Sequence, residues 1–229
     1  MYSHARHVVN NPALLRTVLV VFLLVLAGSK GAMTNSSGSS EPESEMSSAF
    51  AHALISPGPS AQLPKTAAAV FDWLIGDWQV DVYDIEPGGA KHISKGEWHF
   101  QWVLEGRAVQ DVWIVPTRLN RSVNAPGEHN RYGTSLRIYD PKIDAWHVLW
   151  FNPVTQDRTE LTARKVGNIV VQQGIDEDGS YVRWTFQNIT ATSFTWRGEL
   201  SRDGGKTWQL DGEFVARRIG NQAPSSAWR

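Results

Sequence analysis

The spacing of apolar residues along this chain changes once, at Asp77. Just before it, residues 64–76 have the sequence PKTAAAVFDWLIG, in which the apolar positions recur at the spacing of one helix face. Pro64 suits a first helical turn, the three alanines favour helix, and Gly76 ends it. The segment therefore predicts a short helix with one apolar side, which must pack on another element.

After Asp77 apolar and polar residues alternate, which is typical of strands with one buried face. Trp98, Phe100 and Trp102, for example, alternate with polar neighbours. Short turns rich in Gly, Asp and Pro separate the runs, so successive strands are expected to pair as antiparallel hairpins. The strands are predicted at residues 77–84, 94–104, 107–115, 133–139, 144–151, 157–164, 168–173, 180–188, 193–201 and 206–217.

A meander of about ten strands has two open edges, and closure into a barrel removes both. The sequence therefore predicts an all-β protein, an antiparallel up-and-down barrel of about ten strands with the short N-terminal helix closing one end. The barrel domain is expected at residues 64–219 and a C-terminal tail at 220–229. Residues 145–151, AWHVLWF, are apolar on both faces, so this strand is expected to lie under the helix or to form a homodimer contact.

The N-terminal part of the chain has the composition of an export signal followed by a spacer. Residues 17–27, TVLVVFLLVLA, follow two arginines and lead into small residues, which predicts a cleaved signal peptide at 1–29. The run is shorter than the about 20 residues of a membrane span, and an uncleaved membrane anchor is the alternative. Residues 30–63 are rich in Ser, Gly, Pro and Ala and predict a disordered spacer. We therefore expect a secreted or periplasmic protein.

Composition narrows the classes of function. Eleven of the 229 residues are tryptophan, and each large ring has to pack in a core, an interface or a ligand site. The formal net charge of -1 provides no basic surface for nucleic acid. Cysteine is absent, which excludes disulfides, thiolate metal sites and cysteine nucleophiles. His99 and His147 lie in predicted strands without a visible set of metal ligands, so neither a metal nor a cofactor is predicted.

Residues 201–208, SRDGGKTW, fit the spacing S-x-D-x-G-x-T-W. This spacing resembles the Asp-box of sialidases and other β-propellers. A propeller needs several four-stranded blades, and the box occurs once in this chain. We interpret the segment as a hairpin loop in which Asp203 accepts hydrogen bonds from turn amides and Trp208 packs beneath the loop.

Residues 71–84, FDWLIGDWQVDVYD, lead from the predicted helix into Gly76-Asp77-Trp78 at the start of the first strand. This opening resembles the G-x-W motif of calycin barrels, the superfamily of lipocalins, fatty-acid-binding proteins and nitrobindin-like barrels. With residues 133–150, GTSLRIYDPKIDAWHVLW, it is similar to bacterial lipocalin-like proteins of uncharacterised function.

The resemblance implies a structural role for Gly76, Trp78 and a basic residue near the end of the chain. In calycins a tryptophan at this position packs across the closed end of the barrel beneath a basic side chain. Arg218 is the expected partner of Trp78, and Arg217 is the alternative.

The tryptophans of the predicted strands, Trp196 among them, provide flat apolar walls for a pocket, and polar residues on the same strands could hold a ligand's polar end. Either Gln110 or Asp111 must face the apolar side of its strand, and the facing of Arg137 and His147 is equally open. The expected ligand-binding residues are Trp98, Trp102, Gln110, Trp113, Arg137, His147, Trp150 and Trp184.

The predicted barrel and these expected ligand-binding residues are compatible with three functions. The first is a barrel that binds a small apolar or aromatic molecule in a tryptophan-lined cavity. The second is an isomerase, cyclase or lyase that uses the same cavity, and an inward carboxylate or histidine within reach of Arg137 would favour it. The third is a dimeric interaction module whose barrel is filled by its own side chains.

Overall fold

The computed structural model of the chain describes residues 49–86, 88–122, 124 and 130–220. The predicted signal peptide at 1–29, the first part of the predicted spacer and the tail from residue 221 lie outside the described residues. None of the helices among the described residues has the length and hydropathy of a membrane span.

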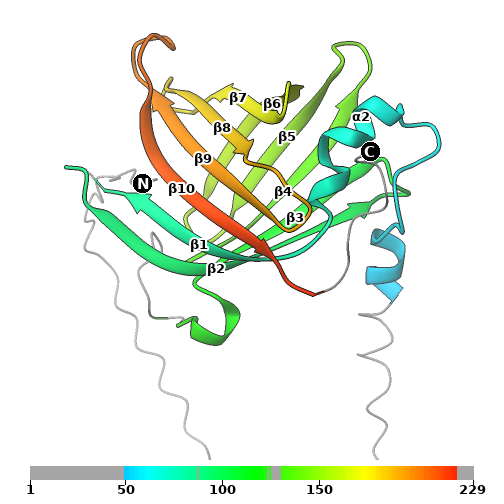
Figure 1. The fold of residues 1–229 in the computed structure, drawn as a ribbon, viewed down its shortest axis with the longest axis horizontal. Coiled ribbons are helices and arrows are strands. Elements are labelled where there is room, and N and C mark those ends of the chain that lie inside the picture. The colour runs from blue at the N-terminus through cyan, green and yellow to red at the C-terminus, as the bar shows by residue number, and fades with distance from the viewer. Residues whose placement is uncertain (1–48, 87, 123, 125–129, 221–229) are drawn as a thin grey trace, which may run out of the picture.

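Ten antiparallel strands close into a barrel, which confirms the predicted fold class (Figure 1). Each strand pairs with its sequence neighbours, and the pairing of the first strand with the last completes the circle. Every predicted strand corresponds to an observed one, with only its ends shifted. The strands are β1 (Gly76–Ile85), β2 (Lys91–Val103), β3 (Ala108–Val115), β4 (Arg131–Asp140), β5 (Ala145–Asn152), β6 (Asp157–Val166), β7 (Ile169–Ile175), β8 (Tyr181–Gln187), β9 (Ser193–Ser201) and β10 (Gln209–Arg218).

A short helical segment precedes the barrel and packs against one end of it. It consists of the helix α2 (Lys65–Phe71) and the 3-10 helix η1 (Asp72–Leu74). Phe71 is fully buried and meets the ring of Trp146 edge-on, with 5.3 Å between the ring centres. The indole Nε1 of Trp146 donates to the Ala67 carbonyl over 3.2 Å. The apolar side of the predicted helix is therefore the side that packs on β5.

Trp78 and Arg218 lie together at this same end. The Arg218 guanidinium carbon is 4.0 Å from the centre of the fully buried Trp78 ring. The guanidinium also donates to the carbonyls of Trp73 and Ile75 over 2.7 Å and 2.6 Å. Partial burial lowers the pKa of Arg218 from its usual value. The structure thus brings together the pair chosen from the sequence, whereas Arg217 points to the outside and forms an ion pair there.

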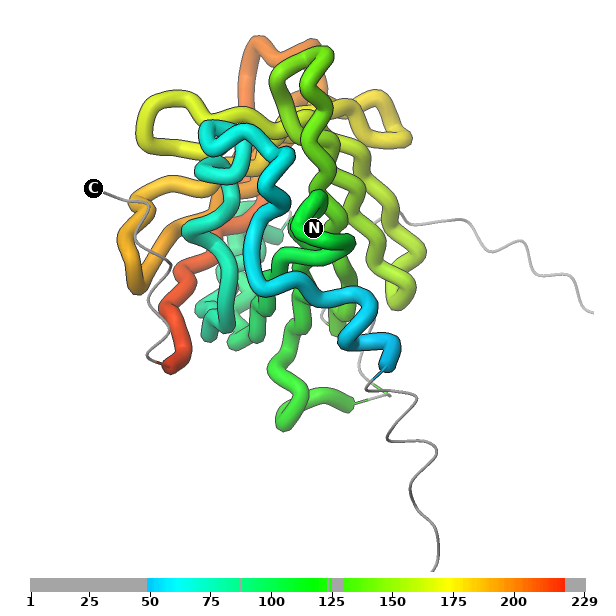
Figure 2. The backbone as a smooth tube through the Cα atoms, turned by 90° about the vertical axis from the view of Figure 1, so that its right-hand side faces the viewer, coloured from blue at the N-terminus to red at the C-terminus, as the bar shows by residue number. Residues whose placement is uncertain are grey.

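The described part of the chain begins within the predicted spacer, at residue 49. Residues 49–54 form a short helix, and the chain then crosses the outside of the barrel (Figure 2). The Ser56 amide donates to the Trp102 carbonyl, and the Gln101 side chain donates back to the Ser56 carbonyl, each over 2.8 Å. The last part of the predicted spacer, 30–63, is therefore held by the end of β2. Composition could not predict this, because the spacer takes part in both bonds through main-chain groups, which every residue carries.

Hydrogen bonds to the Asp203 carboxylate hold the loop between β9 and β10 together. Oδ1 of Asp203 accepts from the amides of Lys206 and Thr207 over 3.0 Å and 2.9 Å, and the Thr207 hydroxyl donates to Oδ2 over 2.6 Å. These bonds, the Thr207 hydroxyl first, lower the pKa of Asp203 to about 2. Trp208 packs beside the loop, with the Arg183 guanidinium 4.0 Å from its ring centre. The contacts agree with the interpretation of the S-x-D-x-G-x-T-W segment as a loop.

Candidate functional site

Aromatic rings fill much of the barrel interior. Phe214 is stacked between Trp113 and Trp196, with ring centres 4.8 Å and 4.2 Å away and planes tilted by only 19° and 11°. Trp98 meets Trp113 edge-on at 4.7 Å. These rings come from β2, β3, β9 and β10, so they join strands that are far apart in sequence into a rigid wall.

Glycines that face the interior make room for the largest rings. A Cβ atom at Gly133 would lie 2.5 Å from Cη2 of Trp150, and one at Gly198 would lie 2.6 Å from Cη2 of Trp196. Real side chains do not approach this closely, so each indole can occupy its position beside the strand only because glycine is there.

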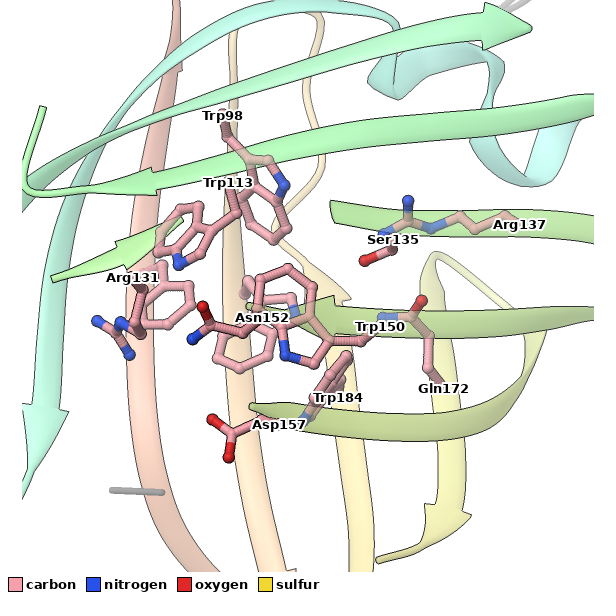
Figure 3. A pocket seen from close by; sticks show the side chains of 12 residues that line it. Trp98, Trp113, Arg131, Ser135, Arg137, Trp150, Asn152, Asp157, Gln172 and Trp184 are labelled. Carbon is pink, nitrogen blue, oxygen red and sulfur yellow. The ribbon is translucent and has the colours of Figure 1, made fainter. Parts of the chain in front are cut away.

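A pocket of about 50 Å³ remains between the rings (Figure 3). One water needs about 10–15 Å³ of such a cavity, so the pocket has room for about three to five waters. Tryptophans from five strands form most of its wall: Trp98, Trp113, Trp150, Trp184 and Trp196.

The pocket runs from the barrel end remote from α2 toward the middle of the barrel. Arg131, Asn152 and Asp157 line its outer part and come from strand ends that lie away from α2. Arg137 and Gln172 line its inner part. In Figure 3 the two inner side chains lie on the opposite side of the indole rings from Arg131 and Asp157.

A buried ion pair lies at the inner part of the pocket. Nη2 of Arg137 is 2.8 Å from Oδ2 of Asp111, and the two side chains are 1% and 0% exposed. Oδ1 of Asp111 accepts from the Ser135 amide over 2.8 Å. The rings of Phe71 and Phe100 flank the guanidinium, with their centres 5.2 Å and 5.5 Å from its carbon. Arg137 is therefore held in one orientation.

Several buried polar atoms of the pocket-lining residues have no hydrogen-bond partner within the described part of the chain. They are Nε1 of Trp98, Nε of Arg131, Nε and Nη1 of Arg137, and both amide atoms of Gln172, a residue that is 0% exposed. Buried polar atoms are nearly always bonded, and an exception needs an explanation. Here the atoms belong to a pocket, where ordered water or a bound molecule would supply the missing partners.

The outer part of the pocket is occupied by a paired arginine. Arg131 donates two hydrogen bonds to the carboxylate of Asp84, over 3.0 Å and 2.8 Å. Its guanidinium carbon is also 6.0 Å and 5.9 Å from the ring centres of Trp113 and Phe214. The two bonds fix the guanidinium plane over the rings at the pocket rim.

The structure brings five of the eight expected ligand-binding residues to the pocket: Trp98, Trp113, Arg137, Trp150 and Trp184. It places the other three elsewhere. Trp102 is buried near η1 and donates its Nε1 to Asp72 over 3.1 Å. Gln110 lies on the outer wall and donates to the Thr134 hydroxyl over 3.1 Å, because Asp111 takes the inward position.

His147, the third of these residues, points to the outside of β5. Its Nε2 lies 3.3 Å from Oδ2 of Asp140, and about half of its side chain is exposed. Phe151 is on the same outer face and is 41% exposed. The dimer contact expected through residues 145–151 stays a prediction.

Sequence reasoning missed the polar residues that line the pocket beside Arg137. Gln172 and Ser135 each occupy an inward position of a strand whose other inward residues are mostly apolar or small. A polar residue at an inward position was the available signal. Recognising it requires knowing which alternate residues of each strand face the interior.

Among the described residues, no group of three His, Asp or Glu side chains is arranged to hold a metal ion. A comparison with protein-family models and a search of curated proteins find no match to this chain.

Proposed function

We propose that this protein binds a small molecule in the tryptophan-lined pocket, at the barrel end remote from α2. The observation that carries the proposal is that two buried side chains of the pocket have polar atoms without hydrogen-bond partners within the described chain: Nε and Nη1 of Arg137, and both amide atoms of Gln172. Each unsatisfied buried group costs about 1–3 kcal/mol. A core that only had to be stable would contain apolar side chains at both positions, whereas a binding site needs the polar atoms.

The size of the pocket limits the ligand. Sites for drug-sized ligands usually measure about 300–1,000 Å³, well above the about 50 Å³ found here. The rings that stack on Phe214 occupy the space that a long acyl chain would need. A cavity of about 150 Å³ accepts benzene, so even a single ring would require the indole walls to move apart. We therefore propose a ligand with one flat ring, or a larger molecule that inserts only such a ring.

The proposal includes a calycin-like relationship and an extracytoplasmic location. Its structural support is a closed up-and-down barrel with a short preceding helix and with Trp78 stacked beneath Arg218 at the end near that helix. Its support for location is the signal peptide predicted at residues 1–29.

Fluorescence titration tests the proposed binding. The pocket contains five tryptophans, so a ring-containing ligand that enters it should quench emission in a saturable way. The variant Ser135→Leu fills the pocket while its main-chain amide can still donate to Asp111. We expect it to fold and to lose the quenching. Quenching that is equal in the variant, or absent for every aromatic ligand tried, would contradict the proposal.

One observation favours catalysis as a second candidate function. Asp111 is an inward carboxylate only 2.8 Å from Arg137, which is the arrangement expected of an isomerase, cyclase or lyase with one acid-base group. Its oxygens, however, face Arg137 and the Ser135 amide, and it does not line the pocket. A binding protein returns its ligand chemically unchanged. Mass spectrometry of a ligand after long incubation therefore distinguishes the two functions, and turnover that is lost in Asp111→Asn would establish catalysis.

A further inference from the structure

We infer that the buried end of the ligand is uncharged and carries both a hydrogen-bond donor and an acceptor, as a carboxamide does. The inference deepens the proposed function and rests on it. It assigns recognition to Gln172 and Arg137, from the charges around the pocket and from the polar atoms that remain without partners.

The charges around the pocket disfavour an anion. Arg137 is already paired with Asp111 at 2.8 Å, and Arg131 is paired with Asp84 through two hydrogen bonds. Asp157 adds a further carboxylate to the pocket wall. A bound carboxylate would thus enter a low-dielectric site without a counter-charge of its own, which is costly.

The same arrangement disfavours a cation at the inner part of the pocket. Arg137 lines the pocket and its partner Asp111 does not, so the guanidinium is the charge nearest to a ligand there. A ligand ammonium group beside it would be buried without a carboxylate of its own, which is costly. An uncharged group avoids both penalties, and the flat indole walls accept the ring that carries it.

The unpartnered atoms define what the uncharged group must offer. An amide side chain supplies two donors and one acceptor, and neither Nε2 nor Oε1 of Gln172 has a partner in the described chain. Nε and Nη1 of Arg137 add further donors, while Phe71 and Phe100 flank the guanidinium. A ligand carbonyl could accept from Gln172 and Arg137, and a ligand N–H could donate to Oε1 of Gln172. A carboxamide has both.

Four probes of similar size test this inference on the full-length protein: benzamide, benzoate, benzylammonium and toluene. Calorimetric titration at neutral pH is expected to show benzamide binding at least tenfold more tightly than each of the others. Equal or tighter binding of any of the other three would overturn the inference and leave the proposed function standing. If none of the four binds saturably, both the inference and the proposed single-ring pocket fail.

A matched pair of variants tests the role of Gln172. Gln172→Leu should lose at least tenfold in affinity for benzamide and keep its affinity for toluene. The preference for benzamide over toluene depends on hydrogen bonds, and the variant no longer has the amide that makes them. It should melt at or above the wild-type temperature, since an unsatisfied buried amide is removed. Gln173→Leu changes the exposed neighbour on the same strand and should leave benzamide binding unchanged.

Unchanged benzamide affinity in Gln172→Leu would overturn the assignment, and so would equal losses in both variants. If Gln172→Leu does not fold, the ranking of the four probes on the wild-type protein still decides the chemical class.

Discussion

Nη2 of Arg137 lies 2.8 Å from Oδ2 of Asp111 inside the barrel, and the two side chains are 1% and 0% exposed. Removing two charges from water costs several kcal/mol for each ion, and their attraction offsets that cost only while both are present. The two residues therefore stabilise the barrel only as a pair. The pair also holds the Arg137 guanidinium in a fixed position at the pocket.

Breaking this pair should destabilise the protein more than removing both charges. Arg137→Met leaves Asp111 buried without its partner, and we expect the free energy of unfolding to fall by about 3–5 kcal/mol. In the double variant Arg137→Met with Asp111→Asn, the asparagine oxygen can still accept from the Ser135 amide. The double variant should recover a substantial part of the loss. Urea unfolding measures both, and equal losses would show that charge burial is not the cause.

Trp78 should be essential to the barrel end near α2. The ring is fully buried and lies edge-on to Phe194, with 4.7 Å between ring centres. Trp78→Ala should cost about 3–5 kcal/mol in thermal or urea unfolding. Trp208 is only half-buried and packs on a loop, so Trp208→Ala should cost much less, about 1 kcal/mol. A loss below about 1 kcal/mol for Trp78→Ala would argue against the stacked arrangement with Arg218.

Gly133→Ala should disturb the pocket through Trp150. The added Cβ would lie 2.5 Å from both Cη2 of Trp150 and the Phe151 carbonyl oxygen, so the indole and the strand must move. Overpacking of this kind costs about 1–3 kcal/mol. Gly58→Ala is the control, because its Cβ would meet nothing within 4 Å and its effect should stay within about 0.5 kcal/mol. Urea unfolding measures both variants. Equal losses in the free energy of unfolding would show that the close contact at Gly133 does not matter.

Asp203 should make the β9–β10 hairpin sensitive to acid. Its pKa is about 2, below the usual 3.8, because the Thr207 hydroxyl and the turn amides favour the ionised carboxylate. Since the folded-state pKa is the lower one, this stabilisation is full above about pH 4 and disappears as the pH falls through about 2. Asp203→Ala should lower the melting temperature at pH 7, and its difference from wild type should shrink between about pH 4 and pH 2. A difference that is constant over this range would contradict the proposed role.

The strands could be predicted from the sequence because their signals are local. In residues 180–188, for example, Val182, Trp184 and Phe186 alternate with polar residues, and β8 has this alternation with the apolar side chains inside. Turn segments that contain glycine and aspartate then define where each strand ends. The helix before the barrel was predictable for the same reason.

The polar residues of the site were less predictable, because two neighbouring polar residues on a strand point in opposite directions. Gln172 and Gln173 are adjacent, as are Gln110 and Asp111, and a shift of one residue exchanges their roles. Only the pairing of each strand with its neighbours shows that Gln172 and Asp111 face the interior.

By itself, the sequence determined the helix, the turns and the succession of strands, since each follows from the order of residues over a short stretch of chain. The tertiary structure alone decided which polar side chains enter the barrel, that Arg137 meets Asp111 there, and how little space the stacked rings leave. These features depend on contacts between side chains from different strands, and such contacts exist only once the sheet has closed.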